Sequence, residues 1–419
     1  MSENTANAAN RGVARGLSRA QTLLVAAAAG MGVANIYYAQ PLLDLMANDL
    51  GISPSSIGLV VTLTQVGYGL GLIFIVPIGD LVDRRKLIIV QGLLSAIALV
   101  VVATAGARTT LLAGMGAVGL LAVLVQTLVA HAAALATPTQ RGGVVGTVTS
   151  GVVTGILAAR SVAGTIADHG GWRTVYLTSA LLTIAMVGIL VRALPRQEVE
   201  RHPETYLNAL LSVPYTFLRE PALLFRGVLA LLIFASFSTF WTALVLPLSA
   251  PPFSYSHTLI GLFGLVGLAG AIGATCAGRL ADRGHGRWTT GISLALLLAS
   301  WGLIVFLPSS VIILLMGVFL LDLAVQAVHV SNLSVVVSLH PRKSGRLIGG
   351  YMVFYSVGSA VGAITATAIH ARYGWPGICI LGGAFSGIAL LVWIASRFQR
   401  ARIERPAWPD VATTDGSNV

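Results

Sequence analysis

Apolar stretches of about twenty residues recur from one end of this chain to the other, and they restrict its fold more than any other feature. A bilayer core about 30 Å thick needs about 20 apolar residues in each α-helix that crosses it. The 419-residue chain is 56% hydrophobic and only 10% charged, with a mean hydropathy of +0.84, which excludes an ordinary soluble domain. The sequence therefore predicts an all-α polytopic membrane protein.

The positive charges support a count of twelve transmembrane helices. With the N-terminus inside, all but four of the 26 Lys and Arg residues fall on one side, as the positive-inside rule requires. Three of the four lie outside, and Arg160 falls within the fifth helix. We expect both termini in the cytoplasm and the protein in a bacterial cytoplasmic (inner) membrane. The predicted spans are 21–46, 57–78, 87–105, 111–135, 142–167, 174–194, 222–248, 259–277, 288–307, 311–337, 347–369 and 377–395.

The longest interior polar stretch divides these spans into two sets of six. Its second half has an apolar stripe from Leu207 to Leu218, which suggests a helix on the inner membrane surface. A loosely ordered linker is the alternative for its first half. The predicted domains are a cytoplasmic tail (1–20), an N-terminal bundle (21–195), a cytoplasmic linker (196–221), a C-terminal bundle (222–396) and a second cytoplasmic tail (397–419).

Short motifs repeat between the two sets of helices. PIGDLVDRRKL (77–87) ends the second helix, and AGRLADRGHGRW (277–288) ends the eighth. A Gly-Trp pair precedes the sixth helix at 171–172 and the twelfth at 374–375. Weak symmetry between six-helix halves is typical of secondary transporters, which bind substrate near the midplane between the repeats.

The repeated loop motif resembles that of the major facilitator superfamily, approximately G-x-L-x-D-R-x-G-R-K, and the resemblance covers essentially the whole chain. The copy at 79–86 is two residues short and lacks the internal glycine, whereas the copy at 278–287 is close to complete. The chain looks most similar to the twelve-helix drug/proton antiporters and their uncharacterised bacterial relatives. Their helix-five motif keeps its glycine spacing at Gly142, Gly151 and Gly155, but Ile156 stands at its proline position.

The resemblance implies two pseudo-symmetric halves, with the second, fifth, eighth and eleventh helices along the seam between them. These helices are rich in glycine, which allows close backbone packing. The resemblance also implies that the loop motifs latch the cytoplasmic side when the protein opens outward. Simple anchoring by positive charge is the alternative. The implied latch residues are Gly79, Asp80, Asp83, Arg84, Gly278, Asp282 and Arg283.

Asp322 is the deepest intramembrane carboxylate that the sequence predicts. It lies in the apolar stretch FLLDLAVQAVHVSN (319–332), where a carboxylate costs roughly 2.5–3.5 kcal/mol on insertion scales. Gln326 and His329 follow at helical spacing, so the three side chains share one stripe. This stripe faces either a wet cavity or a structural cluster of polar groups.

Arg160 is the expected counterpart of Asp322 at comparable depth. We predict either a salt bridge between them, direct binding of an anionic substrate by the guanidinium, or a structural role. In the first case Asp322 is ionised while paired and protonated when the halves separate. His131 and His329 are further candidates for proton handling, although each is otherwise a hydrogen-bonded packing histidine.

The first, fourth, seventh and tenth helices line the central cavity in the superfamily. The implied substrate-cavity residues are Asn35, Tyr38, Gln126, Thr127, Trp241, Thr242 and Gln326. A wall that mixes aromatic and polar side chains suits a small amphipathic solute.

We therefore predict a secondary transporter that exports a small organic compound, drug-like or a metabolite, in exchange for protons. The alternatives are uptake or exchange of a small organic anion, and a membrane receptor or enzyme that does not transport. A nucleotide-binding P-loop, a zinc signature and a nucleophile elbow are missing from the sequence, so we expect no enzyme activity, no cofactor and no metal. The expected partners are the substrate, protons and the lipid bilayer. Nucleic acid is not expected, and the protein is expected to be a monomer.

Overall fold

The computed structural model describes residues 16–137, 139–195, 205–283, 286–339 and 344–403, and these residues contain helices and no strand. Nine of the described helical segments are long and apolar enough to cross a membrane. Two of them, α8 and α16, each contain two spans, and the shorter apolar helix Trp288–Ile304 adds one more. The predicted fold of twelve transmembrane helices is confirmed.

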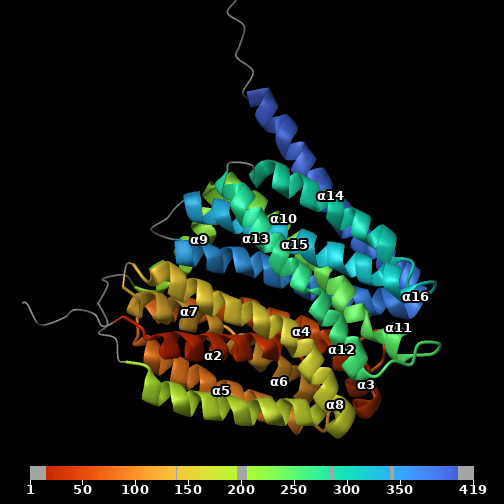
Figure 1. The fold of residues 1–419 in the computed structure, drawn as a ribbon, viewed down its shortest axis with the longest axis horizontal. Coiled ribbons are helices and arrows are strands. Elements are labelled where there is room, and N and C mark those ends of the chain that lie inside the picture. Colours follow the sequence, from red (N-terminus) through yellow and green to blue (C-terminus); the bar gives the residue numbers. More distant parts are fainter. Residues whose placement is uncertain (1–15, 138, 196–204, 284–285, 340–343, 404–419) are drawn as a thin grey trace, which may run out of the picture.

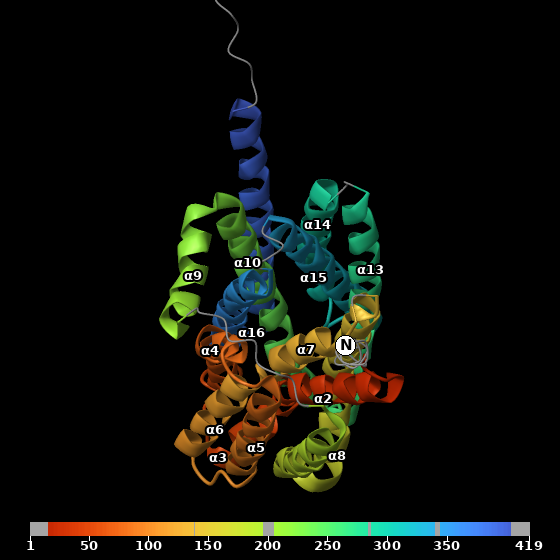
Figure 2. The same ribbon diagram turned by 90° about the vertical axis from the view of Figure 1, so that its left-hand side faces the viewer.

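The helices form two bundles that lie side by side. The first is drawn from red to yellow-green and the second from green to blue (Figures 1 and 2). The first bundle consists of α2 (Arg19–Tyr37), η1 (Gln40–Leu42), α3 (Leu43–Leu50), α4 (Leu59–Phe74), η2 (Val76–Asp80), α5 (Arg84–Ala103), α6 (Arg108–Leu121), α7 (Leu124–Leu135) and α8 (Arg141–Ala193). The second consists of α10 (Pro221–Ala243), α11 (Val245–Ser249), α12 (His257–Val266), α13 (Leu268–Asp282), α14 (Gly286–Ile304), α15 (Val311–Leu339) and α16 (Ser344–Ile403).

Two glycines turn the chain between spans at equivalent places in the halves. Gly171 in α8 has φ 77°, and Gly374 in α16 has φ 61°, a left-handed conformation that glycine adopts without steric cost. Each is followed by a buried tryptophan. The Trp172 indole donates to Asp49 (3.2 Å) and the Trp375 indole to the Ile304 carbonyl (3.0 Å). The repeated Gly-Trp pair is therefore a repeated turn whose tryptophan fixes it to its own half.

Helix α9 (Tyr206–Arg219) occupies the second half of the predicted linker, where the apolar stripe lies. The Tyr206 hydroxyl donates to the Phe74 carbonyl of the first half (2.9 Å). Phe217 stacks on Phe354 of the second half, with ring centroids 5.6 Å apart. The helix thus contacts both halves, and its position on a membrane surface stays a prediction. Residues 196–204 and most of both predicted tails lie outside the described residues.

The two halves meet along two helix pairs, α4 with α16 and α8 with α12. A Cβ added at Gly58 of α4 would overlap the Ala363 carbonyl of α16. Similarly, a Cβ added at Gly164 of α8 would overlap the His257 carbonyl of α12. These are the second, eleventh, fifth and eighth spans, so the predicted seam is confirmed, and glycine at these positions lets the backbones touch.

Candidate functional site

A cavity of about 1160 Å³ lies between the halves. It extends from the middle of the bundle to Gly79, Arg84 and Arg346, and we call this the open end. We call the opposite end, where Gly171 and Gly374 turn the chain, the closed end. In Figure 1, α7 and α9 lie toward the open end, whereas α3 and α11 lie toward the closed end. The volume is slightly above the range of pockets that enclose small organic molecules, about 300–1,000 Å³.

Four of the predicted proton-coupling and substrate-cavity residues line this cavity. They are Gln126, Thr127, Gln326 and His329. The Gln126 amide donates to the Tyr68 hydroxyl (2.8 Å), and the His329 ring nitrogen Nδ1 lies 3.0 Å from the Tyr351 hydroxyl. The structure therefore brings together polar groups from α7 and α15, on opposite halves.

Aromatic side chains form the inner part of the cavity wall. The Tyr37 and Tyr355 hydroxyls are 2.6 Å apart and join the two halves by a hydrogen bond. The Phe234 ring lies against Tyr355 with a centroid distance of 4.0 Å, and Tyr68 and Phe237 also line the wall. Aromatic rings offer large apolar contact area, and tyrosine adds a polar tip.

The charged residues on this wall are basic. Among the described residues that line the cavity, Arg84 and Arg346 carry formal charge, and none is an aspartate or glutamate. The wall therefore provides contact for an apolar, aromatic body together with positive charge near the open end.

Arg160, Trp241 and Asp322 form a buried group between the cavity wall and the closed end. Each side chain is at most 4% exposed. The Arg160 guanidinium carbon lies 3.9 Å from the centre of the Trp241 ring, and the Trp241 indole N–H donates to Asp322 Oδ1 (3.2 Å). One tryptophan therefore contacts the cation through its π face and the anion through its N–H group.

The predicted salt bridge between Arg160 and Asp322 is absent from this conformation. Trp241 contacts both groups, and neither has an ion pair within 4 Å among the described residues. In place of an ion pair, the indole face contacts the cation and the indole N–H donates to the carboxylate. The two residues still lie in the same buried site, as the sequence predicted for an acid on α15 and a base on α8.

Arg160 also contacts the residues behind the cavity wall. Its Nε–H donates to the Gln40 Oε1 atom (2.8 Å), and its guanidinium carbon lies 5.2 Å from the Tyr37 ring centre. The Phe237 ring centre lies 5.9 Å from the same carbon. The buried Nη2 atom has no hydrogen-bond partner in the described part of the chain. The cation is thus held against the two aromatic residues that separate it from the cavity.

The other predicted proton-coupling and substrate-cavity residues lie outside the cavity lining. Asn35 accepts a hydrogen bond from Ser179 (2.7 Å) inside the first half, and Tyr38 packs edge-on against Tyr176. His131 and Thr242 are fully buried within their halves, and Trp241 lies behind the wall. Helical periodicity alone does not separate cavity-facing positions from those that face a neighbouring helix of the same half.

The first loop motif makes local contacts at the open end. The Asp83 carboxylate accepts the Arg85 backbone N–H (2.9 Å) and caps α5, and the Arg84 Nε–H donates to the Gly79 carbonyl (3.0 Å). Arg283 is exposed, and Gly278 lies in α13. The side chains of Asp80 and Asp282 lie outside the described residues. Because the halves are apart at this end, a latch between them stays a prediction.

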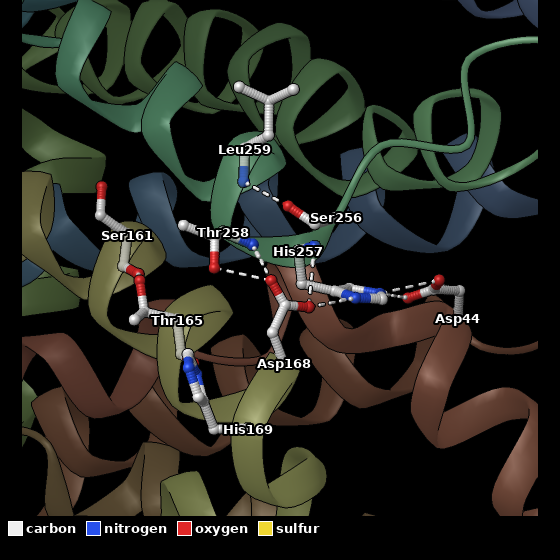
Figure 3. Close-up of polar contacts among 9 residues, drawn as sticks. All are labelled: Asp44, Ser161, Thr165, Asp168, His169, Ser256, His257, Thr258 and Leu259. Atoms are coloured by element: carbon white, nitrogen blue, oxygen red, sulfur yellow. Dashed lines mark hydrogen bonds and ion pairs between the residues drawn. The ribbon is translucent and has the colours of Figure 1, made fainter.

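Three polar residues join the halves at the closed end, and we call them the His257 clamp: Asp44, Asp168 and His257 (Figure 3). His257 Nε2 lies 3.0 Å from both carboxylate oxygens of Asp44, and its Nδ1 lies 3.2 Å from Asp168 Oδ1. Asp44 belongs to α3 and Asp168 to α8 of the first half, whereas His257 begins α12 of the second half. The imidazole is therefore held between two carboxylates of the opposite half.

Asp168 also binds the backbone at the start of α12. Its carboxylate accepts the N–H groups of His257 (3.1 Å) and Thr258 (2.8 Å), together with the Thr258 hydroxyl (2.6 Å). The first N–H groups of a helix have no partner within the helix and favour an anion. A carboxylate of one half thus caps a helix of the other half.

The sequence alone did not identify the clamp, Gln40 or the Tyr37–Tyr355 contact. Asp44, Asp168 and His257 each lie near the end of a predicted span, where charged residues are common. Gln40 and Tyr37 lie in the first predicted span, 21–46, and no role was predicted for either residue. The sequence feature that could have identified the clamp is the presence of His257, Asp44 and Asp168 on the membrane side that has few Lys and Arg residues.

Comparison with known proteins gives a consistent result. The family model of the Major Facilitator Superfamily matches residues 22–248 and 226–412. The chain is 44% identical over 377 residues to the uncharacterized transporter YgaY of Escherichia coli O157:H7, covering 90% of this chain and 95% of that protein.

Solved structures share the fold at low sequence identity. A bacterial homologue of the human lysosomal transporter Spinster, in an inward-facing and unoccupied conformation, matches with a TM-score of 0.71 and 15% identity, covering 91% of this chain and 96% of that one. The human organic anion transporter MFSD10 matches with a TM-score of 0.68 and 17% identity, covering 90% of this chain and all of that one.

Proposed function

Because the chain belongs to the Major Facilitator Superfamily and is a membrane transporter, we propose that it exports a small organic compound in exchange for protons by alternating access. In this proposal the open end faces the cytoplasm, since most Lys and Arg residues lie on that side. The present conformation is then inward-facing. The membrane is a bacterial cytoplasmic membrane, and both termini lie inside.

The observation that carries the proton coupling is the placement of Asp322. It is a buried carboxylate at the seam that accepts a hydrogen bond from one indole N–H and forms no ion pair with Arg160. An isolated buried charge is strongly unfavourable, so such a carboxylate needs either a partner or a proton. A rearrangement of the seam that moves Trp241 would remove the hydrogen bond to Asp322 and also change the distance between Asp322 and Arg160.

A route for the proton follows from the neighbouring residues. Gln326 lies one helical turn from Asp322 on α15 and lines the cavity. A Cβ added at Gly267, the residue between α12 and α13, would lie only 2.9 Å from Asp322 Oδ2, so glycine at this position lets the carboxylate pack against the backbone. We propose that Asp322 exchanges its proton with the cavity past Gln326 in the inward-facing state.

The cavity wall supports an amphipathic substrate that is neutral or anionic. Its aromatic inner wall suits a flat apolar body, and its charged lining residues are Arg84 and Arg346. Arg160 lies directly behind Tyr37 and Phe237. An organic anion is therefore the second candidate substrate class, and one structural neighbour is named as an organic anion transporter.

The test is transport in proteoliposomes. Two fluorescent probes with permanent charge, naphthalene-2-sulfonate and (naphthylmethyl)trimethylammonium, are compared with the uncharged naphthylmethanol in thermal-shift binding. Flux of each charged binder is then followed under an imposed pH gradient. We expect the gradient to drive accumulation in the wild type, and a protonophore to abolish it.

The variant Asp322→Asn separates coupling from binding. We expect it to bind the probe and to lose accumulation driven by the pH gradient, because the amide does not titrate. Asp49→Asn is a matched control, since that carboxylate is exposed and pairs with Arg173 at the closed end. Undiminished pH-driven accumulation in Asp322→Asn would contradict the proposed coupling.

A further inference from the structure

The His257 clamp is separate from the cavity and from the site around Asp322. It lies at the opposite end of the bundle, and its three side chains are 14–22% exposed. We propose that the clamp is a second proton-binding site, shared by the two halves, and that a proton bound at His257 holds the closed end shut.

The chemistry of the imidazole carries this proposal. A neutral imidazole has one N–H donor and one acceptor nitrogen, whereas imidazolium has two N–H donors. Both ring nitrogens of His257 face carboxylate oxygens, which only accept hydrogen bonds when ionised. Only the protonated ring satisfies both carboxylates, through two charge-assisted hydrogen bonds. Without that proton, one carboxylate faces the lone pair of a ring nitrogen.

The charges around His257 also favour the protonated imidazole. Asp168 of α8 and Asp44 of α3 are the ionised groups that face it, and η1 contributes the neutral Gln40 nearby. Asp322 of α15 lies at the other end of α12, beside Gly267, and Arg160 of α8 is directed toward Gln40 and Trp241. With imidazolium the clamp carries one net negative charge. With neutral imidazole it carries two, and both belong to the half that His257 must leave.

A second histidine at this end is differently placed. His169 follows Asp168 directly, but its Nδ1 lies 2.8 Å from the Thr165 carbonyl of its own helix. Figure 3 shows its ring away from the two carboxylates. It is therefore a natural control, because it shares the location and the titrating group but not the contact between halves.

The two proton sites face different solutions in this conformation. The clamp is partly exposed at the closed end, whereas Asp322 is buried next to the cavity that reaches the open end. A low pH in the solution at the closed end therefore favours the conformation in which this end is shut. As the pH rises through the range where histidine titrates, about 5 to 8, the proton is lost and the closed end opens more readily.

The experiment measures opening of the closed end directly. Spin labels are placed on cysteines at Gly106 and Ser309, exposed positions on the two halves at that end, after Cys276 and Cys379 are replaced by alanine. Double electron–electron resonance in lipid nanodiscs then gives the populations of short and long distances from pH 5 to 8, without substrate. For one proton, the ratio of open to closed can rise by at most about tenfold per pH unit.

We expect this rise in the wild type and in His169→Gln, and a response at least twofold smaller in His257→Gln, because the clamp then binds no proton. Asp44→Asn is the second variant if His257→Gln fails to fold, and it should reduce the response at least twofold, since its amide leaves one imidazole nitrogen without an anionic partner. A wild type without pH response, or an unchanged response in His257→Gln or Asp44→Asn, would overturn the proposal. Because no substrate or gradient is used, this result is independent of the proposed export, and Asp322→Asn should keep the clamp response.

Discussion

The two ends of the bundle are built from different interactions. At the closed end, short polar contacts cross between the halves, as where the Ser161 hydroxyl donates to the Gly261 carbonyl (3.1 Å) and the Gly58 N–H to the Thr367 hydroxyl (3.2 Å). At the open end, the halves are separated by a cavity with apolar and aromatic walls.

This difference follows from what each end must do. A single neutral hydrogen bond contributes only about 0.5–1.5 kcal/mol net, because water replaces it when it breaks. An interface held by such bonds can open without a large barrier. The cavity wall, in contrast, must exclude competing water from an apolar ligand, which requires contiguous apolar surface. The comparison predicts the largest effect for a substitution that prevents the closed end from closing.

Gly164→Ala should have the largest effect. An added Cβ overlaps the His257 carbonyl, so α8 and α12 must move apart, at a cost of about 1–3 kcal/mol. We expect the ratio of closed to open conformations to fall by about five- to 150-fold, measured with the spin labels described above. Gly142→Ala is the matched control on the same helix, because an added Cβ there meets nothing within 4 Å. Equal effects of the two variants would show that closure does not depend on this approach.

Trp241→Phe tests the layer between the two ends. The phenyl ring keeps an aromatic face near Arg160 but removes the N–H that Asp322 accepts. A hydrogen bond to a charged group contributes about 1.5–3 kcal/mol, so we expect pH-driven flux to fall about tenfold or more. Probe binding should change less than twofold, since Trp241 does not line the cavity. Loss of binding with unchanged coupling would place Trp241 in the substrate site instead.

These residues show how far the sequence alone leads. The seam was implied by the family resemblance, and the glycine content of the four helices agreed with it. The twelve spans follow from hydropathy, which is a property of single helices. Asp322 stood out for the same reason, since a carboxylate in an apolar run is costly wherever the run packs. Its contact with Trp241 was not predictable, because it depends on the distance between α10 and α15 and on the rotamers of both side chains. The His257 clamp needs three segments, and it exists only while the closed end is shut.

The charge of the ligand tests the open end. In matched binding measurements, we expect naphthalene-2-sulfonate to bind at least about tenfold more tightly than the trimethylammonium probe, a difference of about 1.4 kcal/mol. The reason is the presence of Arg84 and Arg346 and the lack of acids among the described lining residues. Gln326→Glu places a carboxylate on the wall and should reduce or reverse this preference. A cation that binds the wild type more tightly would refute the assigned substrate class.

Two substitutions at Asp83 distinguish a latch from a helix cap, and their expected effect on flux is the smallest of these predictions. In this conformation Asp83 caps α5, a role that asparagine performs about equally well and alanine does not, at a cost of about 1 kcal/mol. If Asp83 also latches the open end in the outward-facing state, it needs its charge. Asp83→Asn should then lower flux a few-fold while thermal stability stays at the wild-type value, whereas Asp83→Ala should lower both. Wild-type flux in Asp83→Asn would leave the cap as the function of this residue, and the open end would then close without a charged contact from it.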